Sequence, residues 1–195
     1  ENQTQDWGIP KLKAPAAWQS GFTGKGVKIS VVDTGISAHP DLTISGGASF
    51  SSVTSSYADD NGHGTHVAGI IAARNNSIGT VGIAHEASIY AVKALEANGS
   101  GSLSSIIAGI DWSISNQMDI INLSLGTTSH SSTLQQVVDR ANNAGILVVA
   151  AAGNNGRADG TGDLVNYPAR YSSAIAVAAT DINNNRASFS ATGST

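Results

Sequence analysis

The sequence of 195 residues contains no cysteine, few aromatic residues and few charged residues. The absence of cysteine excludes a disulfide framework, a thiolate zinc site and a cysteine nucleophile. Aromatic residues make up only 5% of the chain, so its core must be built from small and β-branched side chains, as in closely packed parallel α/β layers. The apolar fraction of 41% is large enough to form that core, which excludes a wholly disordered chain.

Charge and hydropathy exclude two kinds of partner. Charged residues make up 12% of the chain and the net charge is −4, whereas a nucleic-acid-binding surface is basic. No apolar run reaches membrane-spanning length, so we expect neither a nucleic-acid nor a membrane partner. No basic segment followed by an apolar run opens the sequence, so a secretory signal has either been removed or never existed.

The hydrophobic pattern alternates between strands and helices. Short apolar runs predict five strands, at residues 27–32, 88–92, 119–123, 145–151 and 174–178. Helical spacing predicts three helices, at residues 64–73, 104–116 and 132–143. This order predicts a three-layer, doubly wound α/β fold, with a mostly parallel sheet and helices on both of its faces.

Each of these helices carries its apolar residues on one side. The first carries Val67, Ile70 and Ile71 there, and the second carries Ile106, Ile107, Ile110 and Ile114. The last carries its apolar residues at helical spacing, namely Leu134, Val137, Val138 and Ala141.

Sites in parallel sheets form beyond the carboxyl ends of the strands. This rule selects Asp33, residues 123–126 and residues 153–154. Asp33 opens an Asp-Thr-Gly sequence, which an aspartic protease also uses, but that chemistry needs two such carboxylates and only one is present. A dimer could supply the second carboxylate, so an aspartic protease remains an alternative hypothesis.

A second polar stretch, residues 59–69, places His63 between two glycines at the start of a helix. His63 and His66 lie three residues apart on one helix face, which also allows a zinc site, although no glutamate or third ligand is evident. After the most apolar strand comes Asn154, whose side-chain amide is a neutral donor suited to a developing oxyanion. Alone, each of these three residues has an ordinary structural explanation; together they converge on one predicted edge.

Three segments resemble the signatures of the subtilisin-like serine proteases: VVDTGI at residues 31–36, HGTHVAG at residues 63–69 and AAGN at residues 151–154. The resemblance runs from Gln3 to the end of the chain and implies a calcium-stabilised, secreted, extracellular endopeptidase of the bacillus type. It implies that Asp33 orients the imidazole, that His63 is the general base and that Asn154 stabilises the oxyanion.

The same resemblance implies an extended protein or peptide substrate bound by backbone pairing. The implied substrate-binding residues are Ser100, Gly101, Ser102, Ser124, Leu125, Gly126, Ala151 and Gly153. Asn155 and Asn166 would lie near the mouth of the primary specificity pocket, and Tyr167-Pro168 is where the family tends to have a cis proline.

The resemblance also implies Ca²⁺ as the cofactor, held by oxygen ligands. The implied ligands are the side chains of Gln3, Asp41 and Asn76 and the carbonyls of Arg74, Ile78 and Thr80. A weaker second cation site is implied at Ala169, Tyr171 and Ala174.

The family carries its nucleophile in a Gly-Thr-Ser-Met-Ala stretch, and no Gly-Thr-Ser occurs in this sequence. We therefore expect residues 1–195 to be an incomplete peptidase domain whose partner is the C-terminal remainder of the same domain. The expected parent is a monomer with a pro-region in its precursor, and residues 1–195 alone are expected to be inactive. The alternative is a noncatalytic fragment or pseudo-enzyme that binds peptide and calcium.

Overall fold

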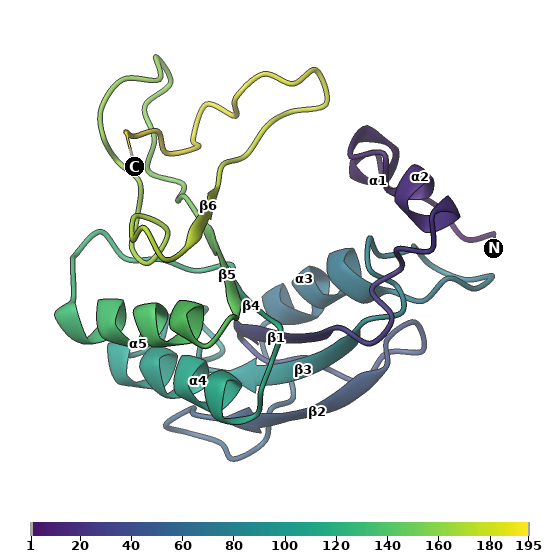
Figure 1. Ribbon diagram of the computed structural model, residues 1–195, viewed down its shortest axis with the longest axis horizontal. Coiled ribbons are helices and arrows are strands. Elements are labelled where there is room, and N and C mark those ends of the chain that lie inside the picture. Colours follow the sequence, from purple (N-terminus) through teal and green to yellow (C-terminus); the bar gives the residue numbers. More distant parts are fainter. Residues whose placement is uncertain (1, 195) are drawn as a thin grey trace. The chain divides into compact units, whose positions relative to one another are not determined.

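The computed structural model describes residues 2–194, which divide into two units with the boundary after Gly109 (Figure 1). The boundary falls inside helix α4 (Leu103–Ser115), so the first part of this helix belongs to one unit and the rest to the other. Among the described residues, no helix has both the length and the apolar character needed to cross a membrane.

The first unit is built on three parallel strands. Their order is β2 (Ile44–Ser49), β3 (Ser88–Lys93) and β1 (Lys28–Asp33), and they lie side by side in Figure 1. Helix α3 (His63–Ala72) packs against β1 and β3. Two short helices, α1 (Gly8–Lys11) and α2 (Ala14–Gln19), precede β1 in the sequence. The β1–β3 register pairs Asp33 with Lys93, so both of these residues end buried strands.

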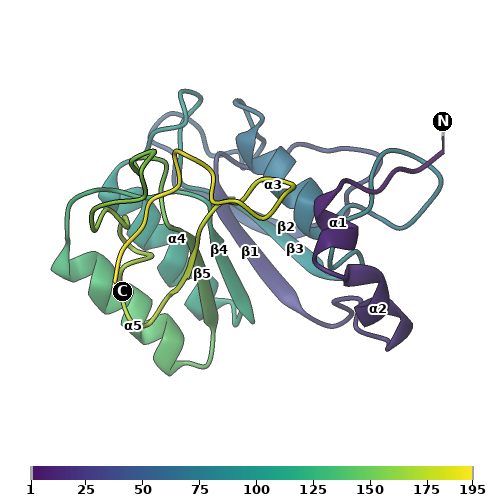
Figure 2. The same cartoon turned by 90° about the horizontal axis from the view of Figure 1, so that it is seen from above.

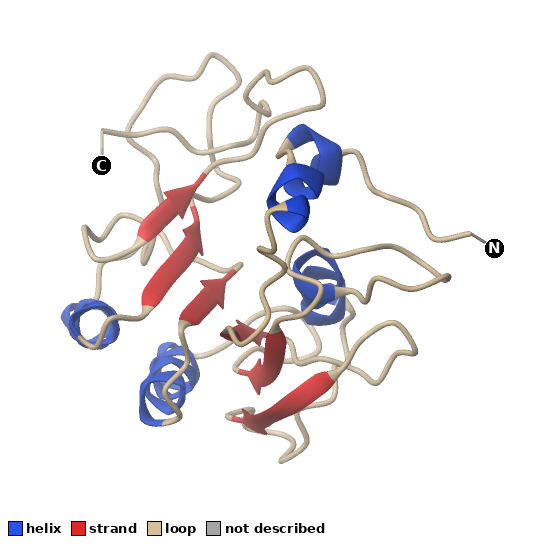
Figure 3. Ribbon diagram, turned by 45° about the vertical axis from the view of Figure 1, so that its right-hand side comes forward, coloured by secondary structure: helices blue, strands red, loops and turns tan. Residues whose placement is uncertain are grey.

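The second unit repeats this parallel arrangement. Its strands follow the order β4 (Ile120–Leu123), β5 (Leu147–Ala151) and β6 (Ile175–Val177), and are among the red arrows in Figure 3. Helix α5 (Ser132–Asn143) packs against β5 (Figure 2). The hydroxyl of Ser131 caps this helix by accepting from Leu134 N at 3.2 Å.

The predicted α/β class is confirmed, and all five expected strands and three expected helices are present within a few residues. The prediction missed strand β2, because its Gly46-Gly47 pair has no apolar alternation. Glycine is required there, since a Cβ on Gly47 would lie 2.1 Å from Ala91 O. The prediction also missed α1 and α2, which are too short to show a period.

Burial follows the prediction in α5, whose four apolar residues named above are all buried. In α3, burial does not follow the side that carries the large apolar residues. The buried residues of α3 are Gly64, Ala68 and Ala72, whereas Ile70 is 50% exposed. The reason is steric: a Cβ on Gly64 would lie 2.1 Å from Gly35 O, so only the small-residue face of the helix can approach β1 this closely.

Strand β6 also differs from the expectation that the strands are covered on both faces. All three of its residues are exposed, including Val177 at 49%. In β5, buried residues alternate with more accessible ones, so α5 covers one face only.

The close approach of α3 predicts opposite effects for two glycines of that helix. Gly64→Ala should lower the stability of the full-length protein by about 1–3 kcal/mol, since the methyl group meets a backbone oxygen. Gly69→Ala is the matched control: no atom of residues 2–194 lies within 4 Å of its Cβ position, so the higher helix propensity of alanine should raise stability by up to about 1 kcal/mol. Calorimetric melting of both variants tests this, and equal melting temperatures would contradict it.

Candidate active site

Asp33 and His63 form a direct hydrogen-bonded pair. Asp33 ends β1 and is fully buried, while His63 opens α3 and its side chain is 49% exposed. His63 Nδ1 lies 2.7 Å from Asp33 Oδ1, and because a carboxylate only accepts, Nδ1 carries the proton. This tautomer leaves the lone pair on Nε2, where the imidazole can act as a base.

The backbone N–H of Thr34 donates to the same carboxylate oxygen at 2.7 Å, which fixes the direction of the Asp33 side chain. The other oxygen, Oδ2, is buried and has no partner among residues 2–194. Most of the hydrogen bonding that stabilises the buried charge therefore converges on the oxygen that faces His63.

Asp59 organises the turn that carries His63. Its Oδ1 accepts from the Thr34 hydroxyl and from the backbone N–H groups of Asn61 and Gly62, at 2.8–3.0 Å. Its Oδ2 accepts from the backbone and hydroxyl of Thr65, at 2.9 and 2.6 Å. One carboxylate thus joins the end of β1 to the first turn of α3.

A further hydrogen bond ties the same two elements together. Gly64 N donates to the Thr34 hydroxyl at 2.9 Å, and that hydroxyl in turn donates to Asp59. In the sequence, Asp59 is one of several polar residues in the stretch 59–69, and nothing in their order shows which carboxylate turns inward.

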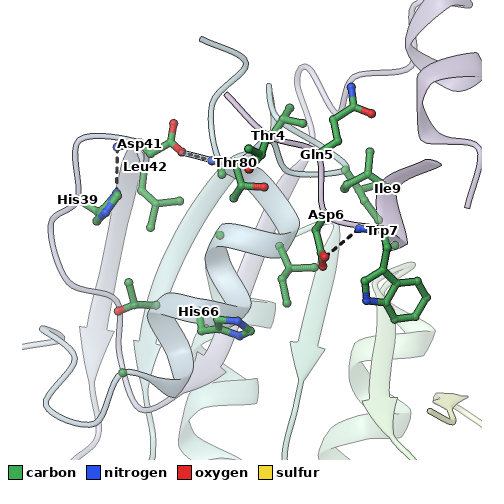
Figure 4. Close-up of a pocket in the computed structure, with 18 of the residues that line it drawn as sticks. Thr4, Gln5, Asp6, Trp7, Ile9, His39, Asp41, Leu42, His66 and Thr80 are labelled. Carbon is green, nitrogen blue, oxygen red and sulfur yellow. Dashed lines mark hydrogen bonds between the residues drawn. The ribbon is translucent and has the colours of Figure 1, made fainter. Parts of the chain in front are cut away.

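His66 lies apart from this pair. It is exposed on α3 and lines an apolar pocket of about 1040 Å³, formed with the N-terminal segment and the loops around Asp41 and Thr80 (Figure 4). His63 is not among the residues that line this pocket. Among residues 2–194, no group of three or more histidine, aspartate or glutamate side chains is arranged to hold a metal ion.

The second unit brings together residues predicted to line the substrate pocket. A Cβ on Gly126 would lie 3.0 Å from Asn166 Cβ, and one on Gly153 would lie 2.6 Å from Asn166 Nδ2. Asn166 N donates to Ala152 O at 2.8 Å, which holds the two segments together. The Oδ1 atom of Asn166 is buried and unpartnered within the described part of the chain.

Asn154 follows β5 and is exposed. It lies in the second unit, whereas Asp33 and His63 lie in the first, so each is described within its own unit. The expected cis peptide bond between Tyr167 and Pro168 is present.

The six residues predicted as calcium ligands gather in the first unit. Gln3 Nε2 lies within 2.6–3.3 Å of four oxygen atoms: the carbonyls of Arg74, Ile78 and Thr80 and Oδ1 of Asn76. Asp41 is 3% exposed and accepts from Asn76 Nδ2 and from Thr80 N, the latter drawn in Figure 4. The four oxygen atoms therefore surround the side-chain nitrogen of Gln3, while Gln3 Oε1 accepts from Asn76 N at 3.2 Å. An oxygen set of this kind also suits a hard cation.

The residues of the weaker predicted cation site lie close together along the chain. Ala169 and Tyr171 are buried, and Ala174 N donates to Tyr171 O at 2.9 Å. The backbone carbonyl of Tyr171 therefore takes part in a turn.

Comparison with known proteins agrees with this geometry. The model of the subtilase family matches residues 24–195. The chain is 59% identical over 192 residues to the thermostable alkaline protease of Halalkalibacterium halodurans, covering 98% of this chain and 52% of that protein. It is 58% identical over 191 residues to subtilisin Savinase of Lederbergia lenta, covering 98% of this chain and 69% of that protein.

A further relative is the minor extracellular protease Epr of Bacillus subtilis, at 58% identity over 189 residues, covering 97% of this chain and 29% of that protein. A buried aspartate that holds a histidine in one tautomer is an arrangement that triad-type hydrolases use. The chain belongs to the subtilase family, the subtilisin-like serine proteases. It spans about half the length of the first relative and less than a third of Epr.

The hydrogen bonds to Asp59 predict a specific dependence of stability on pH. Burial acts to raise the pKa of Asp59, but hydrogen bonds from Gly62, Thr65 and Asn61 outweigh it and hold the pKa well below its usual range. A carboxyl group with a lowered pKa in the folded state stabilises the fold above its unfolded-state pKa of about 3.9, and this stabilisation is lost as the pH falls further.

Asp59→Asn in the full-length protein should therefore lower the melting temperature at pH 7, and the difference from the wild type should shrink below about pH 4. Asp111→Asn is the control, since it removes one negative charge from an exposed pair with Arg140. A difference for Asp59→Asn that stays constant between pH 7 and pH 3 would contradict the assignment.

Proposed function

We propose that the full-length protein containing residues 1–195 is a serine endopeptidase that hydrolyses extended polypeptides. The observation that carries this proposal is the 2.7 Å hydrogen bond between His63 Nδ1 and buried Asp33. His63 Nε2 would take the proton of a serine hydroxyl as that oxygen attacks the peptide carbonyl, and would then deliver it to the leaving amine. Asp33 would hold the tautomer and stabilise the imidazolium.

The serine would come from a segment outside residues 1–195, since this sequence has no Gly-Thr-Ser. Asn154 would donate its side-chain N–H to the oxyanion of the tetrahedral intermediate. Residues 1–195 alone would be inactive, and the alternative function is a noncatalytic protein that binds peptide and calcium.

Two exposed backbone segments support binding of an extended substrate. Among the described residues, none exchanges a hydrogen bond with the backbone of Gly101, Leu125 or Gly126. A peptide could pair with them as an added strand. Residues 124–126, 151 and 153 would then border the primary specificity pocket, with Asn166 near its mouth.

A fluorophosphonate probe tests the proposal directly, since it reacts with an activated serine. The purified full-length protein should gain one adduct, located by peptide mass spectrometry outside residues 1–195, and His63→Ala should abolish labelling. Residues 1–195 expressed alone should remain unlabelled at 19.7 kDa. A folded full-length protein that takes no label and cleaves no peptide would instead support the noncatalytic alternative.

We also propose that Ca²⁺ is bound by Gln3, Asp41, Arg74, Asn76, Ile78 and Thr80, with the second site at Ala169, Tyr171 and Ala174 weaker. Support for the first site comes from the four oxygen atoms that surround Gln3 Nε2 and from the buried carboxylate of Asp41, which accepts from Asn76 Nδ2. The cation would stabilise the folded state and take no part in the hydrolysis. A pro-region in the precursor, secretion and a monomeric state are part of the same proposal.

Calcium binding predicts a melting temperature that rises with the logarithm of free calcium concentration, by an amount equivalent to about 2.7 kcal/mol at 100 times the dissociation constant. Gln3→Ala should flatten this dependence, because it removes one ligand. Gln5→Ala, at an exposed glutamine two residues away, should leave the dependence unchanged. Equal responses of both variants to calcium and to a chelator would reject the site.

A further inference from the structure

Lys93, the last residue of β3, is the largest fully buried side chain in the described part of the chain. An ammonium group in the interior is costly unless each of its protons is hydrogen-bonded. Lys93 Nζ meets that condition, since it donates to Thr34 O at 2.8 Å, to Leu95 O at 2.8 Å and to Asp60 Oδ1 at 2.7 Å. These bonds use all three N–H groups of the side chain.

The acceptors belong to the segments that carry the site. Thr34 follows Asp33 directly, and Asp60 lies three residues before His63. Leu95 begins the connection to residues 100–102, the proposed substrate edge. One side chain therefore joins the element that carries the aspartate, the turn that carries the histidine and the approach to the substrate.

Pairing of the strands does not require this cation. The backbone already fixes β3 against β1, since the carbonyl of Asp33 accepts from Ala94 N at 2.9 Å and from Leu95 N at 3.1 Å. Replacing both members of a buried ion pair by well-packed apolar residues costs little or no stability, whereas removing one member leaves its partners unpaired. The turn before His63, in contrast, is linked to β3 through Asp60 and to β1 through Asp59.

We propose that Lys93 is a positioning residue for the Asp33–His63 pair, acting through its simultaneous bonds to the Thr34 carbonyl and the Asp60 carboxylate. This proposal rests on the proposed protease function. Lys93 touches neither reacting group; it limits the movement of the two segments whose separation determines the 2.7 Å contact. Small displacements of catalytic groups reduce turnover strongly, so the effect should fall on kcat.

The test compares Lys93→Met with a matched control in the full-length protein. Lys93→Met should lower kcat about tenfold or more, with a much smaller change in KM. The proton between His63 Nδ1 and Asp33, observed downfield by ¹H NMR, should exchange faster with water well below the melting temperature. Ile89→Ala, a fully buried position on the same strand, should lower the melting temperature but preserve both kcat and this resonance.

Asp60 supplies a second pair of variants should Lys93→Met not fold. Asp60→Ala keeps Lys93 and its two carbonyl partners but removes the link to the His63 turn, so kcat should fall about threefold and the proton should exchange faster. Asp60→Asn retains an oxygen acceptor and should restore most of the lost kcat. This rescue is not expected if Asp60 contributes only charge.

Two results would overturn the proposal. One is a folded Lys93→Met or Asp60→Ala variant with wild-type kcat and wild-type proton exchange. The other is an Ile89→Ala variant that reproduces the loss of kcat at the same loss of melting temperature. Failure of the protease function is distinguishable, because the wild type would then take no fluorophosphonate label while the His63–Asp33 proton could still be measured in all variants.

Discussion

The close contact between the end of β1 and the first turn of α3 is the constraint on which the site depends. Gly64 allows the helix to rest on the carbonyl of Gly35, and the carboxylate of Asp59 binds groups of both elements. These contacts are short, and several join the same two elements, so they leave little freedom in the separation of Asp33 and His63. The hydrogen bond between these two residues is a consequence of that packing.

The same constraint explains the composition of α3. A helix that approaches a strand this closely must present glycine and alanine to it, so its larger side chains lie elsewhere. Ile70 is therefore half exposed, and with Ile9 and Val81 it lines the apolar pocket around His66. The two histidines of one short motif thus lie in different surroundings, one against a buried carboxylate and one at an apolar pocket.

A few side chains that each form several hydrogen bonds organise the polar groups of this fold. Asp59 and Lys93 link the segments around His63, and Gln3 gathers the oxygen atoms of residues 74–80. In the second unit, Arg186 donates to the carbonyls of Arg157, Ala158 and Ser190 and so fixes the loop after Asn154. Each joins segments far apart in the chain, which suits a fold with many loops and no disulfide.

The sequence by itself determined the α/β class, the strand ends that carry polar residues, and the candidates Asp33, His63 and Asn154, because apolar period and strand-end position are local properties. It did not show the buried face of α3, strand β2, or the roles of Asp59 and Lys93. Those depend on which backbone atoms lie opposite a residue, as the Ala91 carbonyl does for Gly47 and the Thr34 carbonyl does for Lys93. Only the tertiary structure decides such contacts. They join residues tens of positions apart, and the order of residues along the chain does not show which of these lie close together in space.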